Sequence, residues 1–193
     1  MKLAVELWVR LKVIDLVAQT ARITLVDKLD FGERLRGLTR YSYWAMDAEG
    51  ETAPGILEEI DRAIRLDGAF TNQNKHLYRL SGGGEPPRGD LALEKDYPAG
   101  GAPDETAFAV DCLVRELRPD REAGFASRLG GRLRGVKVSR MKCGEIWRIT
   151  VGAPSESAAI AEAERMLVSR SRREGLLLNP HYQRHEILGT KRL

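Results

Sequence analysis

The chain has 193 residues, of which 31 are basic and 28 acidic, and 42% are hydrophobic. That apolar fraction is enough to bury a core, which excludes disorder throughout, and the length suits one ordinary domain or two small ones. No window approaches the roughly 18 uninterrupted apolar residues of a membrane span, and the N-terminus lacks the apolar run of a signal peptide. We therefore expect a soluble cytoplasmic protein.

Strand and helix patterns alternate along the first 80 residues. Strand-forming residues dominate the first of them, and the helical stretches carry apolar residues at the spacing of one helix face. These faces are Val17, Ala21, Leu25 and Leu29 in the first helix and Ile56, Leu57, Ile60, Ala63 and Ile64 in the second. An aspartate cap and a proline in the first turn are typical helix starts. The predicted elements are strand 3–11, a helix capped by Asp15, strand 38–44, a turn at 47–50, a helix from Pro54 and strand 75–80.

Residues 81–106 differ in composition from both flanks. Ten of these 26 residues are Gly or Pro, and the segment carries six acidic and two basic side chains. Glycine widens the backbone choice and proline removes a donor, so a regular element is not favoured here. We predict a linker that separates a domain over 1–80 from a domain over 107–193.

The second half repeats the plan of the first. Its first helix is predicted about two turns shorter and its second about two turns longer than their counterparts, at 3.6 residues per turn. The predicted elements are strand 107–117, a helix from Asp120, a hairpin of 135–141 with 145–151, a helix over 155–174 and strand 182–188. The expected class is α+β, with two β-α-β-β-α-β units whose antiparallel sheets carry helices on one face.

Four short segments recur in the same order in both halves, at offsets of 105, 98, 100 and 107 positions. We interpret this as a tandem duplication. A lone unit would expose sheet edges, so the two copies are expected to pack as an intrachain pseudo-dimer. The matched segments are Val9-Arg10 with Val114-Arg115, Gly32–Leu38 with Gly130–Val136, Ala53-Pro54 with Ala153-Pro154, and Phe70–Asn72 with Leu177–Asn179.

The second half resembles the PurS family over about 80 residues. The first half is similar through its plan and through Asn72, Tyr78 and Leu80. The residues that carry the resemblance are Leu177-Leu178-Asn179-Pro180 with Glu186-Ile187, the strand end Val114–Pro119, Gly124 with Leu129-Gly130, and the strand Gly135–Lys142.

PurS is the small subunit of phosphoribosylformylglycinamidine synthase, an enzyme of de novo purine biosynthesis. The resemblance implies a non-catalytic assembly subunit that bridges the glutaminase and synthetase subunits of that complex and forms a homo-oligomer. It implies no cofactor and no enzymatic activity of the chain itself. The single-chain form of that enzyme has an N-terminal domain similar to two fused PurS units, which gives a tandem precedent.

Arginine is the one residue type with functional chemistry that is over-represented in the chain. Four of its copies flank the repeated turns: Arg34, Arg36, Arg132 and Arg134. We take these four as candidate contacts for a partner or an anion. His181 and His185 are not favoured as metal ligands because Pro180 opposes a helix there, and Cys112 and Cys143 suit buried thiols. Two alternatives stay open: a free-standing small-molecule-binding or regulatory module and, less favoured for want of the aromatic motif of RNA-recognition modules, an RNA-binding protein.

Overall fold

The computed structural model describes residues 1–93, 106–118, 120–171 and 174–193. Two compact units divide the chain, and each takes segments from both halves of the sequence. Unit 1 comprises Met1–Val13, Tyr41–Ala92 and Arg118–Gly144. Unit 2 comprises Ile14–Arg40, Leu93–Leu117 and Glu145–Leu193.

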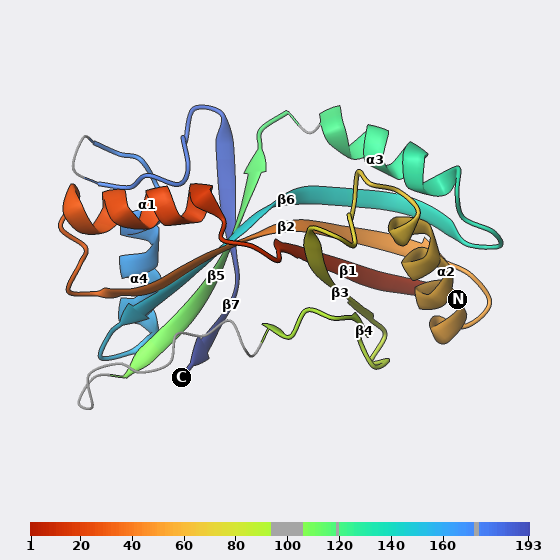
Figure 1. Cartoon of the computed structure of the whole chain (residues 1–193), viewed down its shortest axis with the longest axis horizontal. Helices are drawn as coiled ribbons and strands as arrows, with labels where there is room; N and C mark the ends of the chain where they lie inside the picture. The colour runs from red at the N-terminus through yellow and green to blue at the C-terminus, as the bar shows by residue number, and fades with distance from the viewer. Residues whose placement is uncertain (94–105, 119, 172–173) are drawn as a thin grey trace. The chain divides into compact units, whose positions relative to one another are not determined.

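Unit 1 is an antiparallel sheet with two helices on one face (Figure 1). Its strand order is β4-β3-β1-β2-β6, and Leu7 lies opposite Trp44 on β2 and opposite Leu80 on β3. Its elements are β1 (Lys2–Leu11), the Tyr41–Glu49 part of β2 (Leu35–Glu49), α2 (Ala53–Arg65), β3 (His76–Gly82), β4 (Arg88–Gly89), α3 (Asp120–Gly130) and the Lys137–Gly144 part of β6 (Lys137–Gly152).

Helix α2 supplies most of the helical side of the unit 1 core. The Thr52 side chain accepts a hydrogen bond from the Gly55 amide, and a proline occupies the first turn, as predicted. The predicted apolar face of α2 is confirmed, because all five of its members are buried: Ile56, Leu57, Ile60, Ala63 and Ile64. Alternate residues of β1, including Val5 and Leu7, belong to the same core.

Unit 2 has the same layered arrangement, with strand order β2-β6-β5-β7. Its two helices share one core with alternate residues of the sheet, among them Val110 and Ile149. Its elements are α1 (Leu16–Asp27), the Leu35–Arg40 part of β2, β5 (Ala107–Glu116), the Glu145–Gly152 part of β6, α4 (Glu156–Leu167) and β7 (Gln183–Arg192).

The compact units do not follow the expected boundaries 1–80 and 107–193. Helix α1 belongs to the first half of the sequence, yet its fully buried Leu25 packs in the core formed by β5, β6 and α4. Helix α3 of the second half likewise buries Leu129 in the core of β1, β2 and α2. Each half therefore gives one helix to the sheet of the other half.

The predicted β-α-β-β-α-β plan is wrong in its middle strands. Each half runs β-α-β-α-β, and the predicted hairpin around Cys143-Gly144 is the continuous strand β6. A two-residue hairpin turn needs a glycine with positive φ, and Gly144 is not among the residues with positive φ in the described chain. The strand continues because residues 145–152 form a ladder with β5. Strand β2 likewise includes residues 47–49 of the predicted turn at 47–50 and ends at Glu49.

The predicted helix lengths are also wrong. Helices α1 and α3 have 12 and 11 residues, and α2 and α4 have 13 and 12. Helix α4 stops at Leu167 because Val168 is extended and forms a parallel bridge with Leu178. Amphipathic spacing beyond that point therefore does not extend the helix.

The predicted linker 81–106 begins as ordered structure. Strand β4 pairs with β3, and buried Leu91 donates its amide hydrogen to the Tyr78 carbonyl at 2.9 Å. Its residues 94–105 lie outside the described residues, so the rest of the linker stays a prediction.

The same turn precedes the last strand of each half. The Asn72 carbonyl accepts from the amides of Lys75 and His76, and the Asn179 carbonyl accepts from those of Tyr182 and Gln183. Each asparagine side chain also accepts from the amide two residues on, an Asx turn. The two turns therefore have the same hydrogen-bond pattern at matched positions, and the duplication itself stays a prediction.

Candidate functional site

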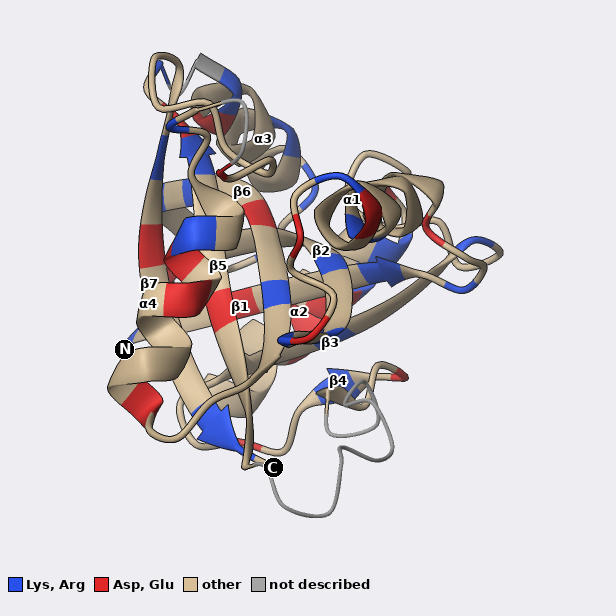
Figure 2. Ribbon diagram, turned by 90° about the vertical axis from the view of Figure 1, so that its left-hand side faces the viewer, with Lys and Arg blue, Asp and Glu red and all other residues tan. Residues whose placement is uncertain are grey.

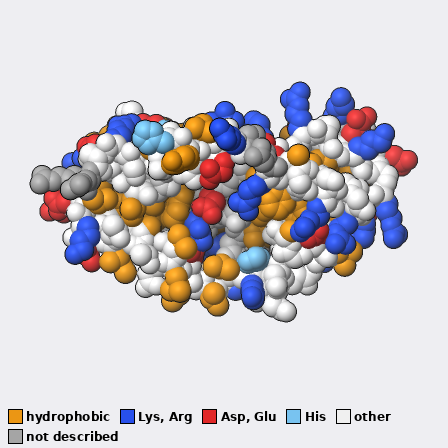
Figure 3. All heavy atoms as spheres, turned by 90° about the horizontal axis from the view of Figure 1, so that it is seen from above, with side chains coloured by type: hydrophobic (Ala, Val, Ile, Leu, Met, Phe, Trp, Pro, Cys, Tyr) orange, Lys and Arg blue, Asp and Glu red, His pale blue; other side chains and the backbone are white. Residues whose placement is uncertain are grey.

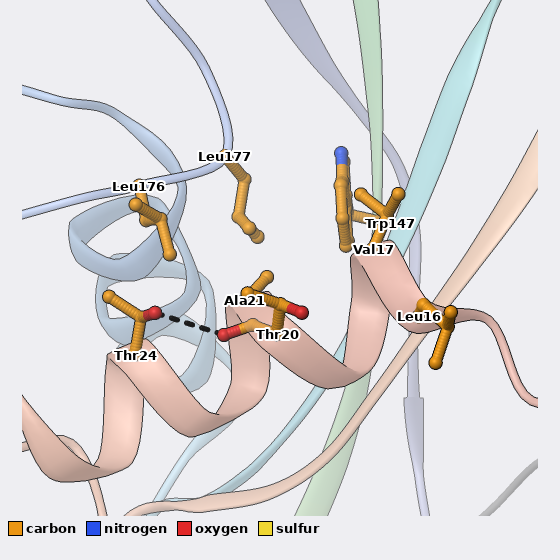
Figure 4. Close-up of a pocket in the computed structure, with 8 residues that line it drawn as sticks. All are labelled: Leu16, Val17, Thr20, Ala21, Thr24, Trp147, Leu176 and Leu177. Atoms are coloured by element: carbon orange, nitrogen blue, oxygen red, sulfur yellow. Dashed lines mark hydrogen bonds between the residues drawn. The ribbon is translucent and has the colours of Figure 1, made fainter.

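An open apolar groove of about 560 Å³ runs beside α1 in unit 2. Figure 4 shows side chains of α1 along one side, Leu176 and Leu177 on the other, and Trp147 of β6 toward the Val17 end of the helix. The lining residues are Leu16, Val17, Thr20, Ala21, Thr24, Trp147, Leu176 and Leu177. The only polar side-chain groups in that lining are two threonine hydroxyls and the indole N–H, so the groove suits an apolar ligand surface.

Helix α1 exposes apolar side chains that a surface helix normally buries. Asp15 caps it by accepting from the amides of Val17 and Ala18 at 2.9 and 3.2 Å. Immediately after this cap, Leu16 is 70% and Val17 51% exposed. Figure 2 shows mainly uncharged ribbon on α1, whose charged residues are Arg22 and Asp27. Apolar side chains are also exposed among the charged ones on the face seen in Figure 3.

The wall opposite α1 is held by backbone geometry. The amides of Leu176 and Leu177 donate to the carbonyls of Met166 and Leu167, each at 3.0 Å. Gly175, just before them, has φ +71, which L side chains rarely adopt. This wall is therefore fixed by main-chain hydrogen bonds.

Trp147 lies in β6, is 4% exposed, and is contacted by Arg40 of β2. The Arg40 guanidinium lies 5.9 Å from its ring centroid, a cation–π distance. Arg40 in turn donates to the Asp15 carboxylate at 2.9 and 3.2 Å. Asp15 therefore both caps α1 and orients the cation against the tryptophan.

The four candidate arginines are divided between the two units. Arg34 and Arg36 lie in unit 2, and Arg132 and Arg134 in unit 1. Arg34 Nη1 lies 3.3 Å from Glu162 Oε2, and Arg132 Nε lies 3.0 Å from Asp67 Oδ2. The Arg134 amide donates to a carboxylate of α2 at 2.6 Å, and Arg36 is half-buried with an interaction of its own. Their role toward a partner or an anion stays a prediction.

The histidines and thiols have local roles. His185 Nε2 lies 3.1 Å from Glu164 Oε1, and within the described ranges no three His, Cys, Asp or Glu side chains form a metal-binding group. Burial, with a smaller effect of Asp111, raises the pKa of Cys112 to about 12. That thiol therefore stays protonated and packs as an apolar group. Cys143 is a half-buried free thiol.

The groove was not among the sites that the sequence indicated. The available signal was Ile14 and Leu16 beside the Asp15 cap, off the apolar face predicted for α1. Val17 was predicted to lie on that buried face, and this prediction is wrong because Val17 is 51% exposed. Apolar residues outside the buried face of a helix indicate an interaction surface. The opposite wall, Leu176 and Leu177, lies about ten residues after the end of α4. No pattern in the sequence indicates that this segment packs near α1.

The structure is that of an α+β protein with an open apolar groove beside α1. No family model, no curated protein and no solved structure matches the chain. Among the helices that the structure describes, none has the length and apolarity needed to cross a membrane.

Proposed function

We propose that the chain is a non-catalytic assembly subunit that binds a partner protein through the α1 groove. The observation that carries this proposal is the exposure of Leu16, Val17 and Leu176 around an open apolar hollow. Contiguous exposed apolar surface on a soluble domain is typical of protein–protein contact sites. The chemistry of the lining favours docking, because the lining side chains include two threonine hydroxyls but no histidine, lysine or carboxylate that could activate them.

The finer proposal is that the partners are the glutaminase and synthetase subunits of phosphoribosylformylglycinamidine synthase. It rests on the PurS-like residues of the second half and on the matched Asn72 and Asn179 turns. Such a chain holds the two enzymes together so that ammonia released by one reaches the other. The exchange of helices between the halves favours an intrachain pair of PurS-like units in place of a dimer of separate chains.

The test is reconstitution with the glutaminase and synthetase subunits of the same source. We expect a complex of defined stoichiometry by size exclusion with light scattering, and glutamine-dependent amidotransferase activity only when all three proteins are mixed. The isolated chain should show no glutaminase, ATPase or amidotransferase turnover above a mock preparation. Absence of a complex, or turnover by the chain alone, contradicts the proposal.

A small-molecule-binding module remains the alternative function. It is favoured over assembly if the chain stays apart from both subunits while a free apolar metabolite protects α1 from hydrogen exchange.

A further inference from the structure

Helices α3 and α1 occupy corresponding places in the two units but differ one turn before their buried leucine. Leu129 of α3 and Leu25 of α1 are each fully buried in the core of their unit. Four residues earlier, α3 has Phe125 whereas α1 has Ala21. Residues four apart lie on the same face of a helix, so these two side chains point toward the same part of each unit.

In unit 1, Phe125 fills the space beside Trp44. The two ring centroids are 5.7 Å apart with the rings at 81°, the edge-to-face arrangement that aromatic pairs prefer. Phe70 completes the cluster at 5.4 Å from Phe125 and 5.6 Å from Trp44. The three rings therefore pack against one another and fill this part of the unit 1 core.

Trp147 is the counterpart of Trp44 in unit 2. Trp44 lies opposite Leu7 in the β1–β2 ladder, and Trp147 lies opposite Cys112 in the β5–β6 ladder. Leu7 and Cys112 each precede the repeated Val-Arg step by two residues. The two tryptophans thus take the same position in the same strand of their sheets.

Leu177 takes the place of Phe70 in unit 2, because each stands two residues before the matched turn asparagine. Phe70 of unit 1 therefore corresponds to Leu177 in unit 2, and Phe125 corresponds to Ala21. Protein interiors are normally close-packed, and the space that these substitutions vacate coincides with the lining of the groove. In unit 1 the corresponding space is filled by aromatic rings.

We propose that the groove receives an aromatic side chain of the partner protein, seated against Trp147 as Phe125 is seated against Trp44. This inference rests on the proposed function, because it names what the assembly partner inserts. A free aromatic molecule would leave the rim of Leu16, Val17 and Leu176 in water. A polypeptide covers that rim as well, and a buried aromatic anchor within an apolar surround is the usual centre of a protein interface.

The decisive variant is Ala21→Phe, which places the side chain of unit 1 into the groove of unit 2. Ile23→Phe is the matched control, since Ile23 is an exposed residue of α1 that does not line the groove. Leu176→Ser changes the exposed rim without entering the core, and it keeps the test valid if Ala21→Phe does not fold. Circular dichroism and thermal melting establish folding for all three.

The first measurement uses N-acetylphenylalaninamide as the probe and N-acetylalaninamide as its control, followed by ¹H–¹⁵N NMR of the whole chain. We expect saturable shifts at the Trp147 indole and the α1 amides with the aromatic probe only. Ala21→Phe should weaken this binding by at least about fivefold, the scale of one aromatic contact, and Ile23→Phe should leave it unchanged. Equal shifts with the alanine probe, no saturable shift, or unchanged binding by Ala21→Phe overturns the inference.

The second measurement repeats the three-protein reconstitution with each variant. Loss of the complex with Ala21→Phe or Leu176→Ser, but not with Ile23→Phe, supports the inference. A complex that tolerates both groove variants overturns it while leaving the assembly function intact. If the wild-type chain forms no complex, the assembly function fails, and the NMR measurement still decides whether the groove selects an aromatic ring.

Discussion

Arg132 Nε lies 3.0 Å from Asp67 Oδ2, so an arginine of the second half of the sequence neutralises a buried carboxylate of the first half within unit 1. Asp67 also accepts from the Ala69 amide at 3.0 Å. Burial raises the pKa of Asp67, but these hydrogen bonds and the charges of Arg132 and Arg128 outweigh it. The net pKa lies below the usual 3.8.

Asp67→Asn should lower the free energy of unfolding at pH 7 by about 1.5–3 kcal/mol, the scale of a hydrogen bond to a charged group. A carboxylate with a lowered pKa stabilises the fold above about pH 3.8 and loses that effect as pH falls through its folded pKa. The difference between wild type and variant should therefore shrink at pH 3 in urea titrations. Asp47→Asn, in the exposed pair with Arg140, is the control and should change little. A difference that grows on acidification contradicts this account.

Tyr78→Phe removes one bond between α2 and β3. The Tyr78 hydroxyl donates to Asp61 Oδ1 at 2.6 Å, and both side chains are buried. Burial and this bond raise the pKa of Tyr78, so the hydroxyl stays a donor. We expect a loss of about 1–3 kcal/mol because, among the described residues, the carboxylate then keeps Arg65 as its side-chain partner. Tyr182→Phe, at an exposed position, should stay within about 0.5 kcal/mol in the same denaturation experiment; equal effects would be evidence against the buried bond.

His76 should make the stability of the chain fall in mild acid. The Asn72 amide donates to His76 Nδ1 at 3.0 Å, which requires an unprotonated nitrogen. Burial, then the charge of Lys75, lowers the pKa of His76 below 6.5. The unfolded chain therefore binds the proton more readily, so this contribution is present above about pH 6.5 and is lost as pH falls through the folded pKa.

His76→Gln tests this pH dependence. The second half has Gln183 at the matched position, where its Oε1 accepts from the Asn179 amide at 3.1 Å. The variant should keep the stability of the wild type near pH 7.5 and lose part of its dependence between about pH 7 and pH 5, measured by guanidinium titration. His181→Gln, at an exposed residue, serves as the control. An unchanged pH profile in His76→Gln would show that the bond has no role.

Gly175→Ala should disrupt the groove wall. A Cβ at this residue would stand 1.8 Å from the Val168 carbonyl oxygen, and φ is +71. We expect a loss of at least about 2 kcal/mol from the left-handed backbone and the clash together, with altered NMR shifts at Leu176 and Leu177. Gly68→Ala is the matched control, because a Cβ there meets nothing within 4 Å. A tolerated Gly175→Ala would mean that the wall rearranges freely.

Residues 1–93 and 106–193, produced separately, should each be incompletely folded and should combine when mixed. Each sheet lacks the helix that the other fragment carries, α1 or α3. Near-UV circular dichroism and size exclusion should show a 1:1 complex with native-like packing. Two stable monomers that do not interact would contradict the exchange of helices.

Local signals allowed much of the secondary structure to be predicted. The Asp15 cap, the proline of α2 and the apolar face Ile56–Ile64 depend on neighbouring residues, and they are confirmed. The continuous strand β6 could not be predicted, because ladder partners on other strands override a local Cys-Gly turn signal.

The exchange of α1 and α3 between the halves could not be predicted from the sequence either. An amphipathic helix shows which face it buries but not which sheet covers that face. The groove was missed for the same reason. Its cause, an alanine at position 21 against a phenylalanine at position 125, becomes visible only after the two helices are superimposed on their units.

The exchange of helices also has a consequence for synthesis. Leu25 emerges from the ribosome early, but the residues that cover it extend to Leu178, about 150 residues later. At about 5–20 residues per second, roughly 8–30 s pass between the synthesis of α1 and that of the last residues of its core. Contacts of such long sequence separation also slow folding. The nascent first half therefore exposes apolar surface during translation, and ribosome-associated chaperones are its expected first partners.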